Sequence, residues 1–233
     1  MNVAVSIIMP CHNGAPFLRE TLQSALNQTH APLEVIVVDD GSTDDSTAIA
    51  ESFGPPVRVI RQRNLGESVA QNVGIAAAWG DYLVFLDADD LLAPATLETQ
   101  IEQLRDGVRG VTCAGHAAFT DDPRKPIRIT MAPLHGWLPE IIHQNLGPPG
   151  CWMVSKEVIL QAGCFHAPMR YFEDWDLWWR VALTGTTYVP VPMVGFLYLP
   201  AVSAVAIGDH TQCRSGLGPR LVAGADVPDL SGS

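Results

Sequence analysis

Short apolar runs alternate with amphipathic segments along residues 1 to 92. An unbroken apolar run is typical of a strand buried on both faces of a parallel sheet, and the amphipathic segments have the spacing of helices that cover one face. This order, β-α-β-α-β-α-β, predicts an α/β fold built on a doubly wound, mostly parallel sheet. The expected strands are 3–9, 33–38, 57–60 and 82–86, and the expected helices are 16–27, a helix opening at 42–45, and 67–78.

The pattern becomes less regular after Pro94 and predicts a smaller region of mixed elements. The stretch 191–207 carries no charged side chain, but Pro192 and Pro200 favour a strand and a loop over a membrane-spanning helix. The expected elements are helices at 95–104, 138–143, 155–161 and 173–183, and strands at 110–119, 127–129 and 151–154.

Polar side chains follow three of the four predicted parallel strands, at the point where each strand ends. They are His12 with Asn13, Asp39 with Asp40, and the sequence Asp87-Ala88-Asp89. The carboxyl ends of parallel strands meet at one edge of a sheet, where ligands bind in open α/β folds. Closely spaced carboxylates repel each other, and their hard oxygens suit Mg²⁺ or Mn²⁺. A solvated loop that caps the next helix is the alternative interpretation of the Asp-x-Asp sequence taken alone.

Composition and charge restrict the possible partners. The 14 basic and 25 acidic residues give a net charge of −11, which argues against non-specific binding to nucleic acid or anionic membranes. An anionic ligand would then need local compensation, most simply from a divalent metal. The five scattered cysteines show no zinc-ligand spacing and favour a reduced, cytoplasmic compartment. The N-terminal stretch lacks the basic region of a signal peptide. The glycine-rich motifs of dinucleotide-binding and P-loop proteins are also missing after the first strand.

Five motifs in this order resemble those of family 2 glycosyltransferases. The resemblance covers roughly residues 3 to 198 and implies a GT-A fold with a nucleotide-sugar donor, a Mg²⁺ or Mn²⁺ ion, and inversion at the anomeric carbon. It divides one domain, 1–200, into a nucleotide-binding half (1–92) and an acceptor half (93–200), followed by an irregular tail (201–233). The motifs are Val5–Gly14, Val37–Asp44, Asn64–Gly66 with Asn72–Gly74, Phe85–Asp90 and Glu173–Trp178.

The resemblance also implies roles for individual residues. On the nucleotide side, Pro10 and His12 would border the nucleotide, and Asp39 and Asp40 would accept a hydrogen bond from the base or ribose. The nucleotide side would also include Asn64, Gly66 and Ala88. Asp87 would face the ribose or the metal, and Asp89 would hold the metal. Asp174 would act as the general base, with Glu173 beside it.

Several alternatives remain open at this stage. The acidic pair Glu173-Asp174 could simply cap a helix, and three nearby tryptophans could either stack on a sugar or pack in the core. Members of the family often have basic and histidine residues after Tyr198, and this chain has other residues there. The second hypothesis is therefore a non-catalytic relative that binds a nucleotide sugar or a partner enzyme. The expected donor is UDP-linked. The expected acceptor is a sugar, a lipid-linked molecule or a polysaccharide, with possible peripheral membrane association through that acceptor and no nucleic-acid partner.

Overall fold

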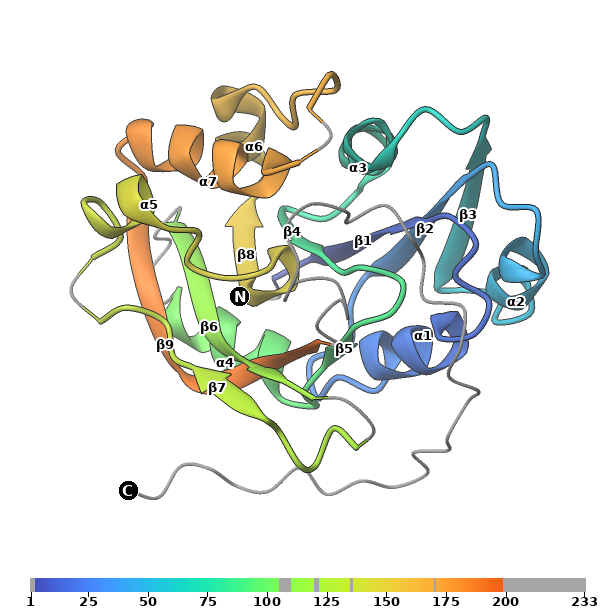
Figure 1. The fold of residues 1–233 in the computed structure, drawn as a ribbon, viewed down its shortest axis with the longest axis horizontal. Coiled ribbons are helices and arrows are strands. Elements are labelled where there is room, and N and C mark those ends of the chain that lie inside the picture. The colour runs from blue at the N-terminus through green and yellow to red at the C-terminus, as the bar shows by residue number, and fades with distance from the viewer. Residues whose placement is uncertain (1–2, 105–109, 120–121, 135, 170, 199–233) are drawn as a thin grey trace.

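A computed structural model describes residues 3–104, 110–119, 122–134, 136–169 and 171–198. These residues form a nine-stranded sheet with helices on both faces (Figure 1). The elements are β1 (Val5–Cys11), α1 (Leu18–Leu26), β2 (Glu34–Asp40), α2 (Ser46–Glu51), β3 (Val57–Gln62), α3 (Glu67–Ala77), β4 (Tyr82–Phe85), β5 (Leu91–Leu92), α4 (Thr96–Gln103), β6 (Gly110–Ala118), β7 (Arg128–Thr130), α5 (Glu140–His143), η2 (Pro149–Cys151), β8 (Trp152–Ser155), α6 (Lys156–Ala162), α7 (Glu173–Leu183) and β9 (Thr187–Tyr198).

The first half of the chain forms the parallel part of the sheet. Its strands lie in the order β3-β2-β1-β4, and each neighbouring pair is parallel. Helix α3 lies on one face of these strands, while α1 and α2 lie on the other (Figure 1). Strand β1 sits in the middle and is buried along its whole length. This arrangement confirms the predicted α/β fold and the doubly wound order of the first half.

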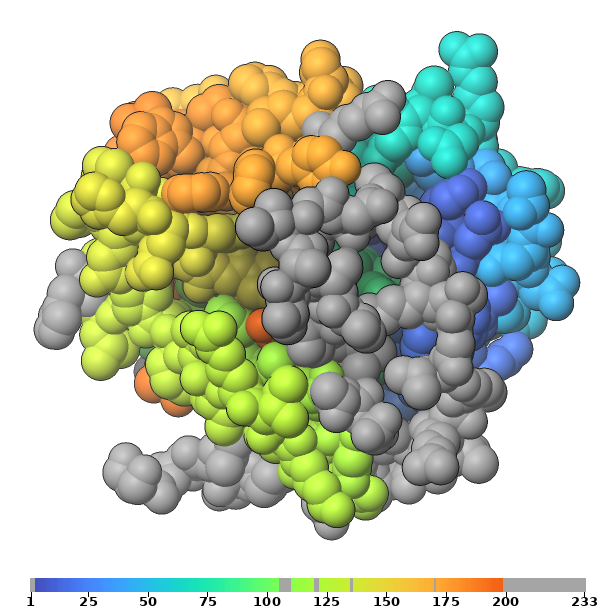
Figure 2. Space-filling model, in the orientation of Figure 1, coloured from blue at the N-terminus to red at the C-terminus, as the bar shows by residue number. Residues whose placement is uncertain are grey.

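The second half extends the same sheet with strands of both directions. Strand β8 pairs with β4 antiparallel, and the sheet then continues through β6, β9 and β5. Strands β6 and β9 are parallel, whereas the short strand β7 pairs antiparallel with the other side of β6. On the face shown in Figure 2, residues of the first half occupy the right side and residues of the second half occupy the left. The two halves therefore share one continuous sheet.

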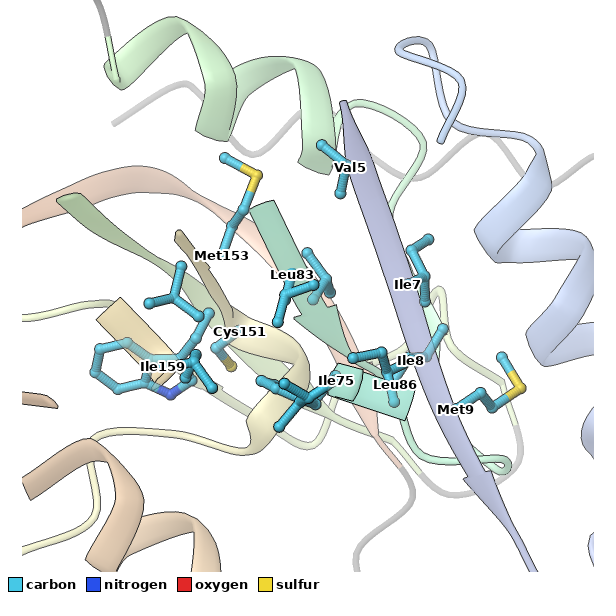
Figure 3. Close-up of a cluster of buried hydrophobic side chains, with 14 of the residues drawn as sticks. Val5, Ile7, Ile8, Met9, Ile75, Leu83, Leu86, Cys151, Met153 and Ile159 are labelled. Atoms are coloured by element: carbon cyan, nitrogen blue, oxygen red, sulfur yellow. The ribbon is translucent and has the colours of Figure 1, made fainter. Parts of the chain in front are cut away.

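A single large apolar cluster joins the two halves. Side chains from β1 and β4 pack with residues of the second half such as Cys151, Met153 and Ile159 (Figure 3). Helix α3 approaches β1 closely at Gly74, where an added Cβ would lie 2.3 Å from Cγ2 of Ile8. A larger residue at position 74 would push α3 away from the sheet, so this glycine allows the helix to pack closely on β1.

Two predicted helix starts were wrong. Helix α2 begins at Ser46 instead of near Ser42, and the expected capping box does not form. Ser42 Oγ instead accepts a hydrogen bond from the backbone N–H of Asn13, and Asp44 Oδ1 accepts one from Ser46 N–H. Helix α1 begins at Leu18, two residues after Pro16, because residues 15–17 form a turn. In both places, side chains that could cap a helix are used to shape a loop.

Other predicted boundaries are confirmed. Helix α7 spans the predicted residues 173–183, and α6 has Ser155 as its N-cap and left-handed Gly163 as its C-cap. The stretch after Pro190 continues strand β9 to Tyr198, and the tail 201–233 lies outside the described residues. Within the described part of the chain, no helix has the length and apolar character needed to cross a membrane.

Candidate active site

The polar residues that follow β1, β2 and β4 lie at one edge of the sheet. Parallel pairing places Cys11, the last residue of β1, beside Asp39 of β2. The same pairing places Asp40 beside Gln62, the last residue of β3. Strand β4 ends opposite Ile8 of β1, so the acidic residues after it face the same crevice. The predicted convergence of strand ends is therefore confirmed.

Asp40 fixes the loop that leads into α3. Its Oδ1 accepts hydrogen bonds from Gln62 Nε2 (2.6 Å) and Leu65 N–H (2.8 Å), and its Oδ2 accepts one from Gly66 N–H (2.9 Å). The residue is only 4% exposed. A carboxylate offers about four acceptor positions, so three internal bonds leave about one for a ligand. The expected contact between Asp40 and the base or ribose remains a prediction.

Asp39 stabilises the turn after β2. It accepts hydrogen bonds from Ser42 N–H (2.8 Å) and from the Thr47 hydroxyl, and Arg61 Nε lies 3.9 Å from Oδ2. Burial opposes ionisation of Asp39, but the hydrogen bonds from Ser42 and Thr47 and the charge of Arg61 outweigh it and hold the pKa below its usual value. Asp39 is therefore an ionised residue that organises the loop, and its expected ligand contact remains a prediction.

His12 lies at the rim formed by these two loops. Its Nδ1 is 2.9 Å from the carbonyl oxygen of Asp40, which makes it the donor of that hydrogen bond. Its Nε2 is 3.2 Å from Asn13 Nδ2 and 3.3 Å from Asn64 Nδ2. Pro10, by contrast, is buried inside β1 opposite Val38. The structure thus places His12 and Asn64 side by side at the surface of the crevice, whereas Pro10 lies beneath it.

A group of carboxylates lies at the end of β4. Oδ1 of Asp87 is buried and has no hydrogen-bond partner within the described residues. Burial raises the pKa of Asp87 to about 8, with further contributions from the negative charges of Asp89, Asp174 and Glu173. Ala88 lies between the two aspartates in the sequence, and its carbonyl oxygen accepts a hydrogen bond from Thr21 Oγ1 (2.9 Å).

The start of α7 brings the acidic pair of the second half to this group. Asp174 Oδ2 accepts a hydrogen bond from Asn145 Nδ2 (2.6 Å), and Oδ1 accepts one from Trp175 N–H (2.7 Å). Both Glu173 and Asp174 are close enough to Asp87 to raise its pKa by repulsion. Residues from β4 and α7, far apart in the sequence, therefore form one acidic centre.

Comparison with known proteins now identifies the family. The family model described as "Glycosyl transferase family 2" matches residues 6–160. The chain belongs to glycosyl transferase family 2. It is 32% identical over 200 residues to an uncharacterized glycosyltransferase of Rickettsia prowazekii, a match that covers 79% of this chain and 60% of the relative. It is also 43% identical over 98 residues to the uncharacterized glycosyltransferase YibD of Escherichia coli, covering 41% of this chain and 28% of YibD.

Solved structures of other glycosyltransferases share the fold. S. aureus TarS in complex with UDP-GlcNAc superimposes with a TM-score of 0.73 at 20% identity, covering 89% of this chain and 60% of TarS. The mannosyltransferase PcManGT of Pyrobaculum calidifontis, in complex with GDP-Man and Mn²⁺, gives a TM-score of 0.65 at 21% identity, covering 86% of this chain and 58% of that chain. These likenesses establish the fold alone and confirm the expected GT-A architecture. The chain spans about 60% of the length of these proteins and of the Rickettsia relative.

The acidic centre fits a divalent metal that arrives with a phosphorylated ligand. Within the described residues, no group of three or more His, Cys, Asp or Glu side chains is arranged so that it could hold a metal ion by itself. Mg²⁺ and Mn²⁺ are commonly held by one or two carboxylates together with substrate phosphates, so Asp87 and Asp89 suffice as the protein's share. The buried, unpartnered Oδ1 of Asp87 is an acceptor that such an ion would satisfy.

Sequence reasoning missed two residues of the centre. Glu67, the first residue of α3, has its pKa raised by desolvation and by the charges of Asp87 and Glu173. Its position directly after the motif ending in Gly66 was a signal that could have identified it. Asn145 had no such signal, because it lies 29 residues before its partner in a proline-rich turn.

Three neighbouring residues proved to be structural, as expected. Burial raises the pKa of the Cys11 thiol to about 11, so it is a neutral packing residue. Trp178 is fully buried and stacks on Trp152 with ring centroids 4.7 Å apart. Asp176 pairs with Arg180 (2.7 Å). The remaining tryptophans of α7, Trp175 and Trp179, are half-buried.

Proposed function

We propose that this chain transfers a glycosyl group from a nucleoside-diphosphate sugar to an acceptor hydroxyl, with inversion at the anomeric carbon and Asp174 as general base. The observation that carries the proposal is the acidic centre itself, where carboxylates from β4 and from α7 meet beside the loops that follow β1 and β2. The TarS and PcManGT structures contain UDP-GlcNAc and GDP-Man, which supports a nucleotide sugar as the donor.

The loops around Asp40 form the donor side of the proposed site. The hydrogen bonds from Leu65 and Gly66 to Asp40 hold the start of α3 at the sheet edge, next to His12 and Asn64. These polar groups form the wall against which the base and ribose would lie. We infer that the donor is UDP-linked and that its diphosphate lies toward Asp87 and Asp89.

Asp87 and Asp89 would hold the Mg²⁺ or Mn²⁺ ion. When bound, such an ion neutralises the negative charge that grows on the diphosphate as the glycosidic bond breaks. Without a cation, burial and, to a smaller extent, repulsion by the neighbouring carboxylates oppose the ionisation of Asp87 and raise its pKa. The protein's own part is therefore to present two oxygen-rich side chains at a fixed position below the donor.

Asp174 would act on the acceptor. The acceptor oxygen attacks the anomeric carbon from the face opposite the diphosphate, the bond from that carbon to the diphosphate oxygen breaks, and the leaving group keeps the electron pair. The acceptor proton passes to the Asp174 carboxylate. The hydrogen bond from Asn145 (2.6 Å) and the position at the start of α7 both favour the charged form that can accept this proton. Removing such a base typically lowers the rate by ~10²–10⁴-fold.

The other hypothesis, a non-catalytic relative, was motivated by the sequence after Tyr198, and those residues lie outside the described part of the chain. We infer that the acceptor is a saccharide, either free, lipid-linked or part of a polysaccharide, and any membrane association would come through that acceptor.

Asp174→Asn tests the proposal. The purified chain would be incubated with UDP-GlcNAc, other UDP-sugars and GDP-mannose with Mn²⁺, and the release of UDP or GDP would be measured with and without saccharide acceptors. We expect turnover to fall by at least about 100-fold in the variant, while titration calorimetry shows unchanged donor binding. If Asp174→Asn keeps its activity and Glu173→Gln loses it, the base is Glu173. If the parent chain binds donors but never turns over, the chain is the non-catalytic relative.

A further inference from the structure

The segment 163–169 leads from α6 toward the start of α7, where Asp174 lies. It leaves α6 at the left-handed Gly163, and α7 begins at Glu173. In Figure 1, α6 and α7 lie next to α3, a helix of the first half of the chain. The position of Asp174 relative to the sheet therefore depends on how the segment 163–169 is held against the first half.

Asn72 of α3 holds this segment by two hydrogen bonds to a single residue. Its Nδ2 donates to the carbonyl oxygen of Phe165 (2.8 Å), and its Oδ1 accepts from the backbone N–H of Phe165 (2.9 Å). The two residues are 93 positions apart in the sequence. Because Phe165 is only 3% exposed, a side chain at position 72 that lacked the donor or the acceptor would leave a buried backbone group without this partner.

Phe165 also contacts the strand that leads to the acidic centre. Its ring lies edge-on to the ring of Phe85, the last residue of β4, with centroids 5.0 Å apart. Phe85 precedes Asp87 by two residues. The backbone of Phe165 is thus fixed to α3 while its ring packs against β4, so Asn72 sets the distance between the segment 163–169 and the end of β4.

The residue after Phe165 is tied to the first turn of α7. Nδ1 of His166 lies 3.1 Å from Oδ2 of Asp176, and the same oxygen accepts a hydrogen bond from Nη2 of Arg180 (2.7 Å). Asp176 is two residues after Asp174 in the same helix. A displacement of Phe165 would therefore be passed through His166 and Asp176 to the turn that carries Asp174.

We propose that Asn72 is a positioning residue for the reaction, because it holds the segment that sets where Asp174 lies relative to Asp87. A general base must lie within hydrogen-bond reach of the hydroxyl that it deprotonates, and a misplacement of about 1 Å can lower the rate by on the order of 10²-fold. Asn72 uses its amide on Phe165, so it acts through Asp174 and not on the substrate. The proposal rests on the proposed function, because it assumes that Asp174 is the base.

Asn72→Ala removes both hydrogen bonds and keeps a good helix former at this position. Asn72→Asp is a milder second variant, because its carboxylate still accepts from the Phe165 N–H but cannot donate to the carbonyl oxygen. Gln28→Ala is the matched control. The amide of Gln28 also donates to a backbone carbonyl, that of Ala93 (2.8 Å), and accepts from a backbone N–H, that of Leu97 (3.1 Å), but it lies far from α7 in the sequence and binds the start of α4.

Steady-state release of UDP or GDP from the donor panel with Mn²⁺ would be measured for each variant. We expect Asn72→Ala to lower kcat by about 10- to 100-fold and Asn72→Asp by less, with the donor KM and the Kd of UDP with Mn²⁺ within about twofold of the parent. Gln28→Ala should leave kcat within about twofold. Hydrogen–deuterium exchange should become faster in peptides covering residues 164–176 in Asn72→Ala but not in Gln28→Ala. Adding Asn72→Ala to Asp174→Asn should slow the enzyme no further, because the positioned base is already absent.

Several results would overturn the positioning role. They are an equal loss of kcat in Asn72→Ala and Gln28→Ala, a raised donor KM with unchanged kcat, unchanged exchange in residues 164–176, and full additivity with Asp174→Asn. An active parent whose kcat is unaffected by Asn72→Ala would show that only the positioning role is wrong. A parent that releases no UDP or GDP from any donor contradicts the proposed function, and the positioning role with it.

Discussion

Asp87→Asn should stabilise the metal-free protein while impairing its function. The folded state buries Oδ1 of Asp87, although the residue as a whole is half-buried, and places the carboxyl group among the charges of Asp89, Asp174 and Glu173. Its pKa is raised from 3.8 to about 8, so folding favours the protonated form. Between these two values the folded state binds more protons than the unfolded state, and stability must fall as the pH rises. Asparagine has nearly the same shape and cannot ionise, so it removes this penalty.

The magnitude follows from the two pKa values. Each pH unit above the unfolded value costs ~1.4 kcal/mol until the folded value is reached, which gives about 4 kcal/mol at pH 7 for a fully isolated group. Asp87 is only half-buried, and counter-ions that enter the crevice screen the repulsion, so we expect a measured gain of ~1–3 kcal/mol. For a chain of this size, that gain corresponds to a rise in Tm of roughly 3–10 °C.

Thermal unfolding followed by circular dichroism in EDTA would measure the effect at several pH values. The variant should be more stable than the parent at pH 7 and 8, and the difference should become small near pH 3, below the unfolded-state pKa of 3.8, where Asp87 is mostly protonated in both states. Asp81→Asn makes the same chemical change at the exposed opposite end of β4 and serves as the control. Added Mn²⁺ with UDP should raise the Tm of the parent more than that of Asp87→Asn.

Two results would refute this reasoning. A variant that is no more stable than the parent at pH 7 would show that neither burial nor its neighbours' charges disfavour the ionised form of Asp87. A gain that persists unchanged at about pH 3 would show that the stabilisation has a cause other than ionisation.

Three further substitutions test other parts of the site. Asp89→Ala should abolish Mn²⁺-dependent UDP binding and leave the circular dichroism spectrum unchanged; equal UDP affinity in variant and parent would contradict its assignment as a metal ligand. Asp40→Ala should lower the free energy of unfolding in urea by about 2–4 kcal/mol, because the N–H groups of the loop lose a buried charged acceptor, and a loss below about 1 kcal/mol would argue against this role. Asn145→Ala should move the acidic limb of the kcat/KM profile to higher pH, because Asp174 loses the donor that favours its charged form; an unmoved limb would mean that the bond has no catalytic role.

The local pattern of the sequence determined most of the fold. The apolar runs in residues 1 to 92 have the length and composition of buried strands, and their regular alternation with amphipathic segments predicts a mostly parallel sheet. The sequence also predicted α7 at its observed bounds, because the acidic residues at its start and the spacing of the apolar residues along it are both typical of a helix. The placement of Asp40 and Asp87 at one sheet edge followed from the direction of parallel strands.

Helix starts were harder to predict, because side-chain hydrogen bonds of similar energy compete. Ser42 and Asp44 have the chemistry of helix caps, but contacts with the loop after β1 take their place. Those contacts join residues about 29 positions apart, and no local pattern records them.

The chemistry of the site was decided by tertiary structure. The sequence placed Asp87 and Asp174 in separate motifs, but only the packing of α7 over the sheet brings their charges together. The same packing gives Asp174 its hydrogen bond from Asn145 and brings Glu67 into the acidic centre. The sequence therefore determined which carboxylates exist and on which elements they lie. The tertiary structure determined which of them repel each other, because electrostatic interaction depends on distance in space and not along the chain.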